Sequence, residues 1–222
     1  MDLRDKRKNE LDHQKELRKE EVIQAAINVF NENGIENTKM TDIAKSAEVG
    51  VASIYRYFKT KPELVIEVAI RAWETTITAY LKDFDQTEYI ARNGIQRVEA
   101  LLSVFLTLYK EHKEFLRFIE EFDNYMIKEK ISPDRLAVYE KTILNLMPFM
   151  MDALEKGKKD GSIKPSVHSE EFYMTLTHAL ISLCQKLISR NFILTSDQEI
   201  DGESQVKLMI DMAIHYISNG TP

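Results

Sequence analysis

The sequence predicts an all-α protein, and two features of its 222 residues lead to that class. It contains only 7 Gly and 5 Pro, which is few for a sheet-rich chain with many tight turns. Its hydrophobic runs are mostly long and have helical rather than alternating spacing. Apolar residues make up 44% of the chain, enough for a large core, and this excludes a disordered protein. We therefore expect about nine helices, three short ones close together and then six longer ones.

The first expected elements form an N-terminal module that follows a charged extension. Residues 1–16 are dense in both charges and nearly free of hydrophobes, so we expect them to be a solvated extension. Residues 17–33 show an amphipathic helical pattern that ends at Gly34, a C-terminal cap glycine. Two short helices follow, one with Met40 and Ile43 on its apolar stripe and one in the segment VASIYRYF.

Longer helices account for the rest of the chain. The helix at 60–81 opens with Pro62 in its first turn, where the missing N–H has no cost. The remaining helices are expected at 87–110, 112–128, 133–158, 169–190 and 203–218. The expected domains are the extension at 1–16, a module at 17–62 and a larger helical domain at 63–222.

The two short helices have the form of a helix-turn-helix, MTDIAKSA-EVG-VASIYRYF. In such a unit the second helix lies in the major groove of DNA, and its first residues reach base edges. Gly50, Ala52 and Ser53 are small and allow the backbone to approach closely. Val51 is suited to contact a thymine methyl group. Sequence readout is therefore expected at this end of the helix.

The aromatic and cationic side chains that follow divide into two sets. Ile54 and Phe58 are expected to anchor the second helix in the core of the module, while Tyr55 and Tyr57 point elsewhere. The two tyrosine hydroxyls, together with Lys61 at the next helix start, suit hydrogen bonds to phosphate oxygens. A plain helical hairpin with core aromatics explains any one tyrosine, but it does not explain the whole set.

Charge is distributed unevenly along the chain. The net charge is −6, but residues 37–61 carry five Lys or Arg against two Asp or Glu. Phosphate attraction depends on the charges at the contact face, so an acidic protein with this locally basic module is compatible with DNA binding. A minor interpretation of the extension makes Arg4, Lys6, Arg7 and Lys8 a basic arm near DNA.

The segment TKMTDIAKSAEVGVASIYRYFKTKPEL resembles the DNA-binding domain of TetR-family transcriptional regulators. The shared features are a Thr-rich start, an Ile-Ala pair, a short turn, a hydroxyl residue, an aliphatic residue, Tyr-x-Tyr/His-Phe and Lys-x-Lys before the fourth helix. The resemblance covers residues 18–66, and the rest of the chain matches only in length and helical plan. It implies a dimeric regulator with a helix-turn-helix domain and a variable ligand-binding C-terminal domain.

The resemblance also implies DNA-contact roles for individual residues. Thr38 and Thr41 match positions that cap the second helix or touch phosphate, and Lys61 matches the phosphate-facing start of the fourth helix. Glu48 departs from the family pattern, which often has a turn glycine there, and Lys39 stands where a second small hydroxyl is usual. The expected DNA-binding residues are Thr38, Lys39, Thr41, Gly50, Val51, Ala52, Ser53, Tyr55, Tyr57 and Lys61.

The last two helices are apolar around much of their circumference, which requires burial on two sides. A central core helix explains one such helix, but a terminal pair fits a four-helix dimer interface better, as the resemblance also implies. A two-fold dimer would place two recognition helices about one DNA turn apart, which predicts a palindromic operator. The expected interface residues are Leu176, Leu180, Leu183, Leu187, Met209, Ala213 and Ile217.

The middle helices are rich in methionine and aromatic residues, most of which we expect to be core. Methionine in such numbers also favours an adaptable apolar cavity. We therefore expect a pocket for a hydrophobic or aromatic small-molecule effector. The expected pocket residues are Trp73, Phe105, Tyr109, Phe118, Phe122, Met126, Met147, Met151 and His178.

The sequence lacks motifs for catalysis or metal binding. Cys184 is the single cysteine, which excludes an intramolecular disulfide and a cysteine-cluster metal site. The one Glu-x-x-His sequence begins at Glu10 in the charged extension, and there is no Gly-rich phosphate loop or serine elbow. No run of about 18 apolar residues occurs. We expect a cytoplasmic protein with no enzyme activity, metal, cofactor or membrane association.

These expectations combine into a homodimeric, sequence-specific DNA-binding regulator, a repressor that a ligand releases from a palindromic operator. Ligand binding would favour a conformer with the wrong spacing between recognition helices, and the helix at 60–81 would transmit the change. The alternative is a helical small-molecule- or partner-binding protein without operator activity.

Overall fold

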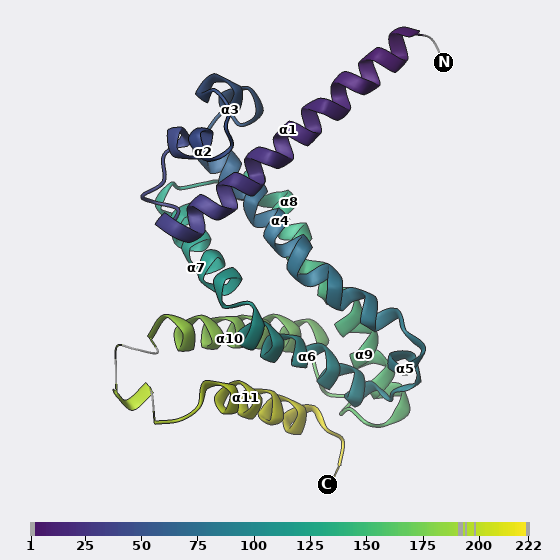
Figure 1. Cartoon of the computed structure of the whole chain (residues 1–222). Coiled ribbons are helices and arrows are strands. Elements are labelled where there is room, and N and C mark those ends of the chain that lie inside the picture. Colours follow the sequence, from purple (N-terminus) through teal and green to yellow (C-terminus); the bar gives the residue numbers. More distant parts are fainter. Residues whose placement is uncertain (1–2, 191–192, 194, 198, 221–222) are drawn as a thin grey trace. The chain divides into compact units, whose positions relative to one another are not determined.

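The computed structural model describes residues 3–190, 193, 195–197 and 199–220, and these residues form an all-α protein, as predicted (Figure 1). No helix in these ranges is both long and apolar enough to cross a membrane. An isolated antiparallel bridge joins Ile163 and Ser218. The helices are α1 Leu3–Asn33, α2 Met40–Ser46, α3 Val51–Tyr57, α4 Lys61–Leu81, α5 Thr87–Ala91, α6 Gly94–Glu111, α7 Lys113–Lys128, α8 Pro133–Ile143, α9 Met147–Asp160, α10 Ser169–Arg190 and α11 Gly202–Ile217.

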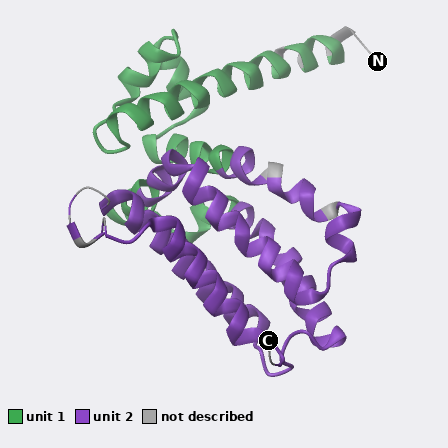
Figure 2. Ribbon diagram, turned by 60° about the horizontal axis from the view of Figure 1, so that its bottom comes forward, with its two compact units in different colours: residues 1–72, 121–139 green, residues 73–120, 140–222 purple. Residues whose placement is uncertain are grey.

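The chain forms two compact units, which are coloured separately in Figure 2. Unit 1 contains Met1–Ala72 and Glu121–Tyr139, and unit 2 contains Trp73–Glu120 and Glu140–Pro222. This division differs from the expected domain boundary after residue 62. Unit 1 includes the first part of α4 and the end of α7, in addition to the helix-turn-helix.

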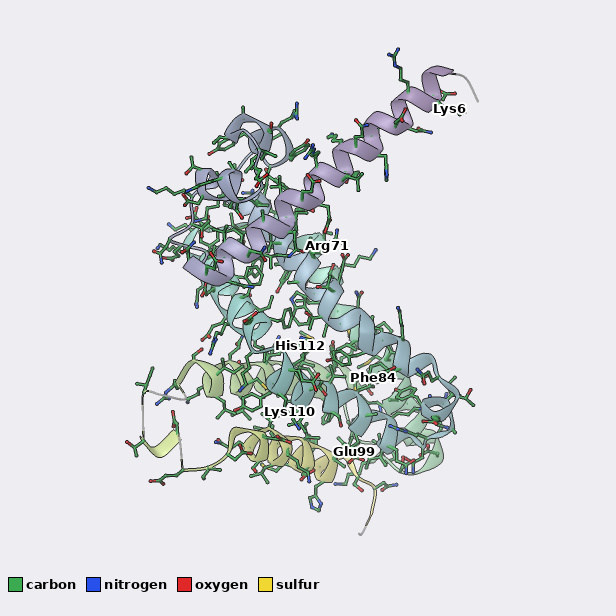
Figure 3. All side chains as sticks on the ribbon, in the orientation of Figure 1. Lys6, Arg71, Phe84, Glu99, Lys110 and His112 are labelled. Carbon is green, nitrogen blue, oxygen red and sulfur yellow. The ribbon has the colours of Figure 1, made fainter. Side chains whose placement is uncertain are left out.

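Unit 1 has a core made by the apolar faces of α1 to α4. Val22, Ala26, Ile43, Ile54 and Leu64 have almost no exposed surface. Two ion pairs tie α1 to α4: Lys19 with Glu67 at 2.9 Å, and Arg71 with Glu20 at 2.6 Å (Arg71 is labelled in Figure 3). Helix α1 also packs on α2, the first helix of the helix-turn-helix.

The N-terminal extension, for which the sequence predicts exposure to solvent, is helical. Helix α1 begins at Leu3, although the side chains described before Arg18 are exposed. The segment contains no Gly or Pro and is rich in Lys, Glu and Arg, which have high helix propensity. These residues continue the amphipathic helix that packs in unit 1, so no new helix nucleus is needed.

Unit 2 is built from α6, α9, α10 and α11, which pack against one another. Helices α6 and α9 pack closely at Gly94 and Gly157, since a Cβ added to Gly94 would overlap the backbone of Gly157. Near the other end of α6, the Tyr80 hydroxyl and His112 Nε2 lie 2.9 Å apart (His112 is labelled in Figure 3).

Two helices expected as continuous are each divided. The helix expected at 87–110 becomes α5 and α6 because Asn93 caps α6: its side chain accepts from Gln96 N at 3.0 Å, and Gln96 accepts from Asn93 N at 3.2 Å. The helix expected at 133–158 becomes α8 and α9, with a 3₁₀ turn at residues 144–146 between them. Pro148 lies in the first turn of α9, where proline is favoured.

Candidate nucleic-acid interface

Helices α2 and α3 of unit 1 bury one face and expose the other. Ile43 and Ala44 on α2 and Ile54 on α3 are buried, and Phe58 closes the end of α3. The two predicted core anchors, Ile54 and Phe58, are therefore where the sequence pattern placed them. The opposite face, which holds most of the expected DNA contacts, is open to solvent.

The start of α3 presents small side chains to solvent. Gly50 is the N-cap, with φ −67° and ψ 142°, and its carbonyl accepts from Ser53 N at 2.8 Å. Gly50, Val51 and Ala52 are exposed, and Ser53 is half-buried. A Cβ added at Gly50 would meet nothing within 4 Å. This end of α3 is thus suited to approach base edges in a major groove.

The two tyrosines of α3 differ in their surroundings. Tyr55 is 50% exposed, so its hydroxyl is available to a ligand. Tyr57 is half-buried, and Arg56 lies over its ring at 5.3 Å and donates to its hydroxyl at 3.4 Å. Sequence reasoning assigned Arg56 no role. The structure makes it a neighbour of Tyr57 and places a guanidinium on this surface.

Thr38 differs from the sequence prediction. It is only 2% exposed, and its hydroxyl donates to the carbonyl of Gly34 at 2.8 Å. Because it is buried, Thr38 stabilises the end of α1 instead of contacting phosphate. Lys39 is the N-cap of α2, and its N–H donates to the Asp42 carboxylate at 2.8 Å. The side chains of Lys39 and Thr41 are exposed, as a phosphate contact requires.

Lys61 has its ammonium group engaged within unit 1. The ammonium donates to the carbonyl of Glu36 at 3.2 Å and lies 5.1 Å from the ring centroid of Tyr125. Burial lowers the pKa of Lys61, and the carboxylates of Glu129 and Glu36 oppose this shift. Lys61 thus differs from Lys39, whose side chain is exposed.

Glu48 adopts the backbone conformation that the missing turn glycine would have. Its φ of 52° lies in the left-handed region. Glu48 N donates to Lys45 O at 3.3 Å, and Val49 N donates to Ala44 O at 3.0 Å. This pair of hydrogen bonds is a Schellman motif with Glu48 at the position where glycine is preferred. The turn geometry is therefore kept despite the substitution.

Replacing Glu48 with glycine is expected to raise the free energy of unfolding by about 0.5–1 kcal/mol. A left-handed conformation costs a non-glycine residue about 1–2 kcal/mol, and the greater freedom of glycine in the unfolded chain offsets part of the gain. Urea denaturation measures the change. Glu48→Ala removes the same carboxylate but keeps the strained φ, so it serves as the control. Equal stability of the two variants would show that the backbone at Glu48 is not strained.

The nine expected pocket residues are divided between the two units. Phe122 and Met126 belong to unit 1 and are buried there. Within unit 2, Trp73 packs edge-to-face on Phe115 at 5.0 Å, and Phe105 and Phe118 are also buried. The other expected pocket residues of unit 2 are less enclosed: Tyr109, Met147 and Met151 are half-buried and His178 is exposed.

A groove of about 380 Å³ runs between α10 and α11 in unit 2. None of the nine expected pocket residues lines it. Its rim is continuous with an apolar stripe on α11, where Leu208, Met212 and Tyr216 are spaced four residues apart and are each more than half exposed. The groove is lined by Val167, His168, Glu171, Phe172, Thr175, Leu176, Ala179, Met209, Met212, Ala213 and Tyr216.

Two of the seven expected interface residues are buried in the core of unit 2. Leu180 and Ile217 have no exposed surface, so they are core residues of unit 2 and cannot contact a second chain directly. Leu176, Met209 and Ala213 do line the groove, although Leu176 and Ala213 are mostly buried. Leu183 and Leu187 are half-buried on α10. The exposed stripe on α11 was not among the expected interface residues.

Residues 22–68 match the family model described as bacterial regulatory proteins, tetR family. Over 152 residues the chain is 29% identical to the uncharacterized HTH-type transcriptional regulator YhgD of Bacillus subtilis, a match that covers 67% of this chain and 73% of that protein. Over 163 residues it is 25% identical to the HTH-type transcriptional repressor KstR2 of Mycolicibacterium smegmatis, which covers 70% of this chain and 72% of that protein.

The fold is similar to that of a solved bacterial regulator. The crystal structure of the transcriptional regulator FadR from Bacillus subtilis in complex with stearoyl-CoA aligns with a TM-score of 0.59 and 18% identity. The alignment covers 89% of this chain and 98% of that one. The helical plan of both units is therefore shared with a known regulator.

Proposed function

We propose that this chain, which belongs to the tetR family of bacterial regulatory proteins through its residues 22–68, represses transcription as a homodimer on a palindromic operator. The observation that carries the proposal is the exposed face of α2 and α3. It combines small residues at the start of α3 with Lys39, Thr41 and Tyr55 around them. Small residues admit a base-reading approach, and the surrounding donors are suited to phosphate oxygens.

Each expected contact has a separate role in this proposal. Val51 and Ala52 contact base edges, with Val51 suited to a thymine methyl group. Lys39 neutralises one phosphate, and the uncharged hydroxyl of Tyr55 donates a hydrogen bond to another. Tyr57 with Arg56 forms a third phosphate contact. These residues are exposed or half-buried on the same helix-turn-helix.

The second copy is proposed to bind at the α10–α11 face of unit 2. The exposed stripe of Leu208, Met212 and Tyr216 adjoins an apolar groove, and such a contiguous apolar surface marks an interaction site. A two-fold axis at this face would make the interface isologous and the operator palindromic.

A hydrophobic or aromatic effector is proposed to release the repressor. FadR of Bacillus subtilis, which shares the fold of this chain, was crystallised with stearoyl-CoA, a ligand with a long apolar acyl chain on a charged nucleotide carrier. Unit 2 of this chain contains four buried aromatic residues, Trp73, Phe105, Phe115 and Phe118, and the rings of Trp73 and Phe115 are in contact. Helix α4 is continuous from Lys61 in unit 1 to Leu81 in unit 2, so a displacement in unit 2 has a direct path to the helix-turn-helix.

Selection of bound duplexes from a random pool tests the proposed function. We expect enrichment of a palindromic consensus whose half-sites lie about one helical turn apart. On the selected operator, Tyr55→Phe is expected to weaken binding by at least about a hundredfold, because each of the two protomers loses a hydrogen bond to a charged phosphate that contributes about 1.5–3 kcal/mol. It should leave the salt dependence unchanged, because no cation is removed. No enrichment from the pool would favour a helical ligand- or partner-binding protein without operator activity.

A further inference from the structure

The loop between α1 and α2, residues 34–39, is held by α4 and α7 of the same unit. Ile35 N donates to the Glu121 carboxylate at 2.9 Å. Lys61 at the start of α4 donates to the carbonyl of Glu36 at 3.2 Å. Lys128 near the end of α7 donates to the Glu36 carboxylate at 2.8 and 2.9 Å. Backbone groups that no helix satisfies are thus bonded by side chains of other elements.

Lys61 is the member of this set that also contacts an aromatic face. Its ammonium lies 5.1 Å from the ring centroid of Tyr125 on α7, within the range of a cation–π interaction. Tyr125 is only 5% exposed, so the ring offers a desolvated surface to the cation. A lysine with both an acceptor and a ring is more restrained than a solvated one.

The position of the α1–α2 loop determines the position of α3, the proposed recognition helix. The loop leads directly into α2, and α2 packs on α3, with Ile43 of α2 and Ile54 of α3 both buried. A shift of the Glu36 carbonyl therefore moves the start of α2, and α3 with it. Precise placement matters because base readout depends on groove geometry.

We propose that Lys61 is a positioning residue for DNA binding. It holds the α1–α2 loop against Tyr125 and does not contact the DNA phosphates. This inference rests on the proposed operator binding and refines it. A phosphate contact by Lys61 would require its ammonium to leave the Glu36 carbonyl and the Tyr125 ring. Lys39 is exposed and needs no such displacement, so it supplies the charge contact of this face.

Salt dependence of operator affinity separates the two roles. The logarithm of the binding constant falls with the logarithm of salt concentration by about 0.9 for each phosphate that is neutralised. A homodimer carries two copies of each lysine, so losing a phosphate-binding lysine reduces the slope by about 1.8. Losing a positioning lysine lowers affinity without changing the slope.

The experiment compares Lys61→Met with Lys39→Met, its matched control, on the operator selected from the random pool. We expect Lys61→Met to weaken binding roughly tenfold with an unchanged slope, and Lys39→Met to reduce the slope by about 1.8. Lys61→Arg keeps the cation and should restore most of the affinity. A slope reduced by about 1.8 in Lys61→Met, or an affinity equal to that of the original protein, would overturn the proposal.

Two further measurements distinguish the positioning role of Lys61 from a general loss of fold, and one of them does not require the operator. Tyr125→Leu should reproduce the affinity loss, and adding Lys61→Met to it should cost little more, because both residues act through one contact. Without DNA, hydrogen exchange at the amides of residues 35–38 should be faster in Lys61→Met but not in Lys39→Met. Unchanged exchange overturns the positioning role. Faster exchange with no enriched operator supports the loop contact and refutes the proposed function instead.

Discussion

Replacing Met212 with glutamate is expected to convert the proposed homodimer to monomers and to weaken operator binding by at least about a hundredfold. Met212 is the middle residue of the exposed stripe on α11, between Leu208 and Tyr216, and it also lines the α10–α11 groove. A two-fold dimer carries the substitution twice, so both copies affect the same isologous interface.

The expected loss of dimer affinity follows from the apolar burial that is lost and the charge that is introduced. Burying one methionine side chain stabilises by about 1.5–3 kcal/mol, and the dimer would lose two such contributions. A carboxylate placed in the apolar interface adds a further desolvation cost of several kcal/mol. The dimer dissociation constant is therefore expected to rise by a factor on the order of 1,000 or more. Sedimentation equilibrium measures it, and operator titration measures the consequence for DNA binding.

Ile90→Glu is the matched control for this substitution. Ile90 is a similarly exposed aliphatic residue in the same unit, but it lies on α5 and does not line the groove. The control should remain dimeric and bind the operator normally. A Met212→Glu protein that stays dimeric and binds the operator fully would place the interface elsewhere, and a monomeric Ile90→Glu protein would indicate a general loss of fold.

Local sequence patterns were sufficient to predict the buried face of the helix-turn-helix, because the residues of this face lie close together in the chain. The spacing of Ile54 and Phe58, four residues apart, predicted that both face inward, and both are buried. Gly34, expected as a C-terminal cap, has φ 78° and donates to Phe30 O at 2.8 Å. The contacts of the Lys61 ammonium were not predictable from local patterns, because its aromatic partner Tyr125 is distant in sequence.

Unit 2 was less predictable because its helices are apolar on several sides. Periodicity indicated that α10 and α11 are buried on more than one face, but it does not say which face meets the same chain and which remains open. Leu180 and Ile217 were therefore assigned to the interface although both are core. The division before α6 did have a sequence signal, because Asn93 and Gln96 have the spacing of a capping box.

No sequence pattern indicated the contact between α6 and α9, which depends on two glycines far apart in the chain. A Cβ on Gly94 would overlap the backbone of Gly157 and lie 2.7 Å from the carbonyl oxygen of Ala153. Backbone atoms cannot turn aside as a flexible side chain can, so the helices themselves would have to separate. The separation would also disturb the hydrogen bond from Gly94 N to Asp160, which is 2.8 Å long.

Gly94→Ala is expected to lower the free energy of unfolding by about 3–5 kcal/mol, a large part of the 5–15 kcal/mol typical of a folded protein. Alanine has the higher helix propensity, but that gain is at most about 1 kcal/mol, so the steric cost decides the sign. Urea denaturation measures the loss. Gly50→Ala is the control, because its added methyl group meets open space and it should change stability by less than about 1 kcal/mol. If both variants were equally stable, α6 and α9 would not pack through Gly94.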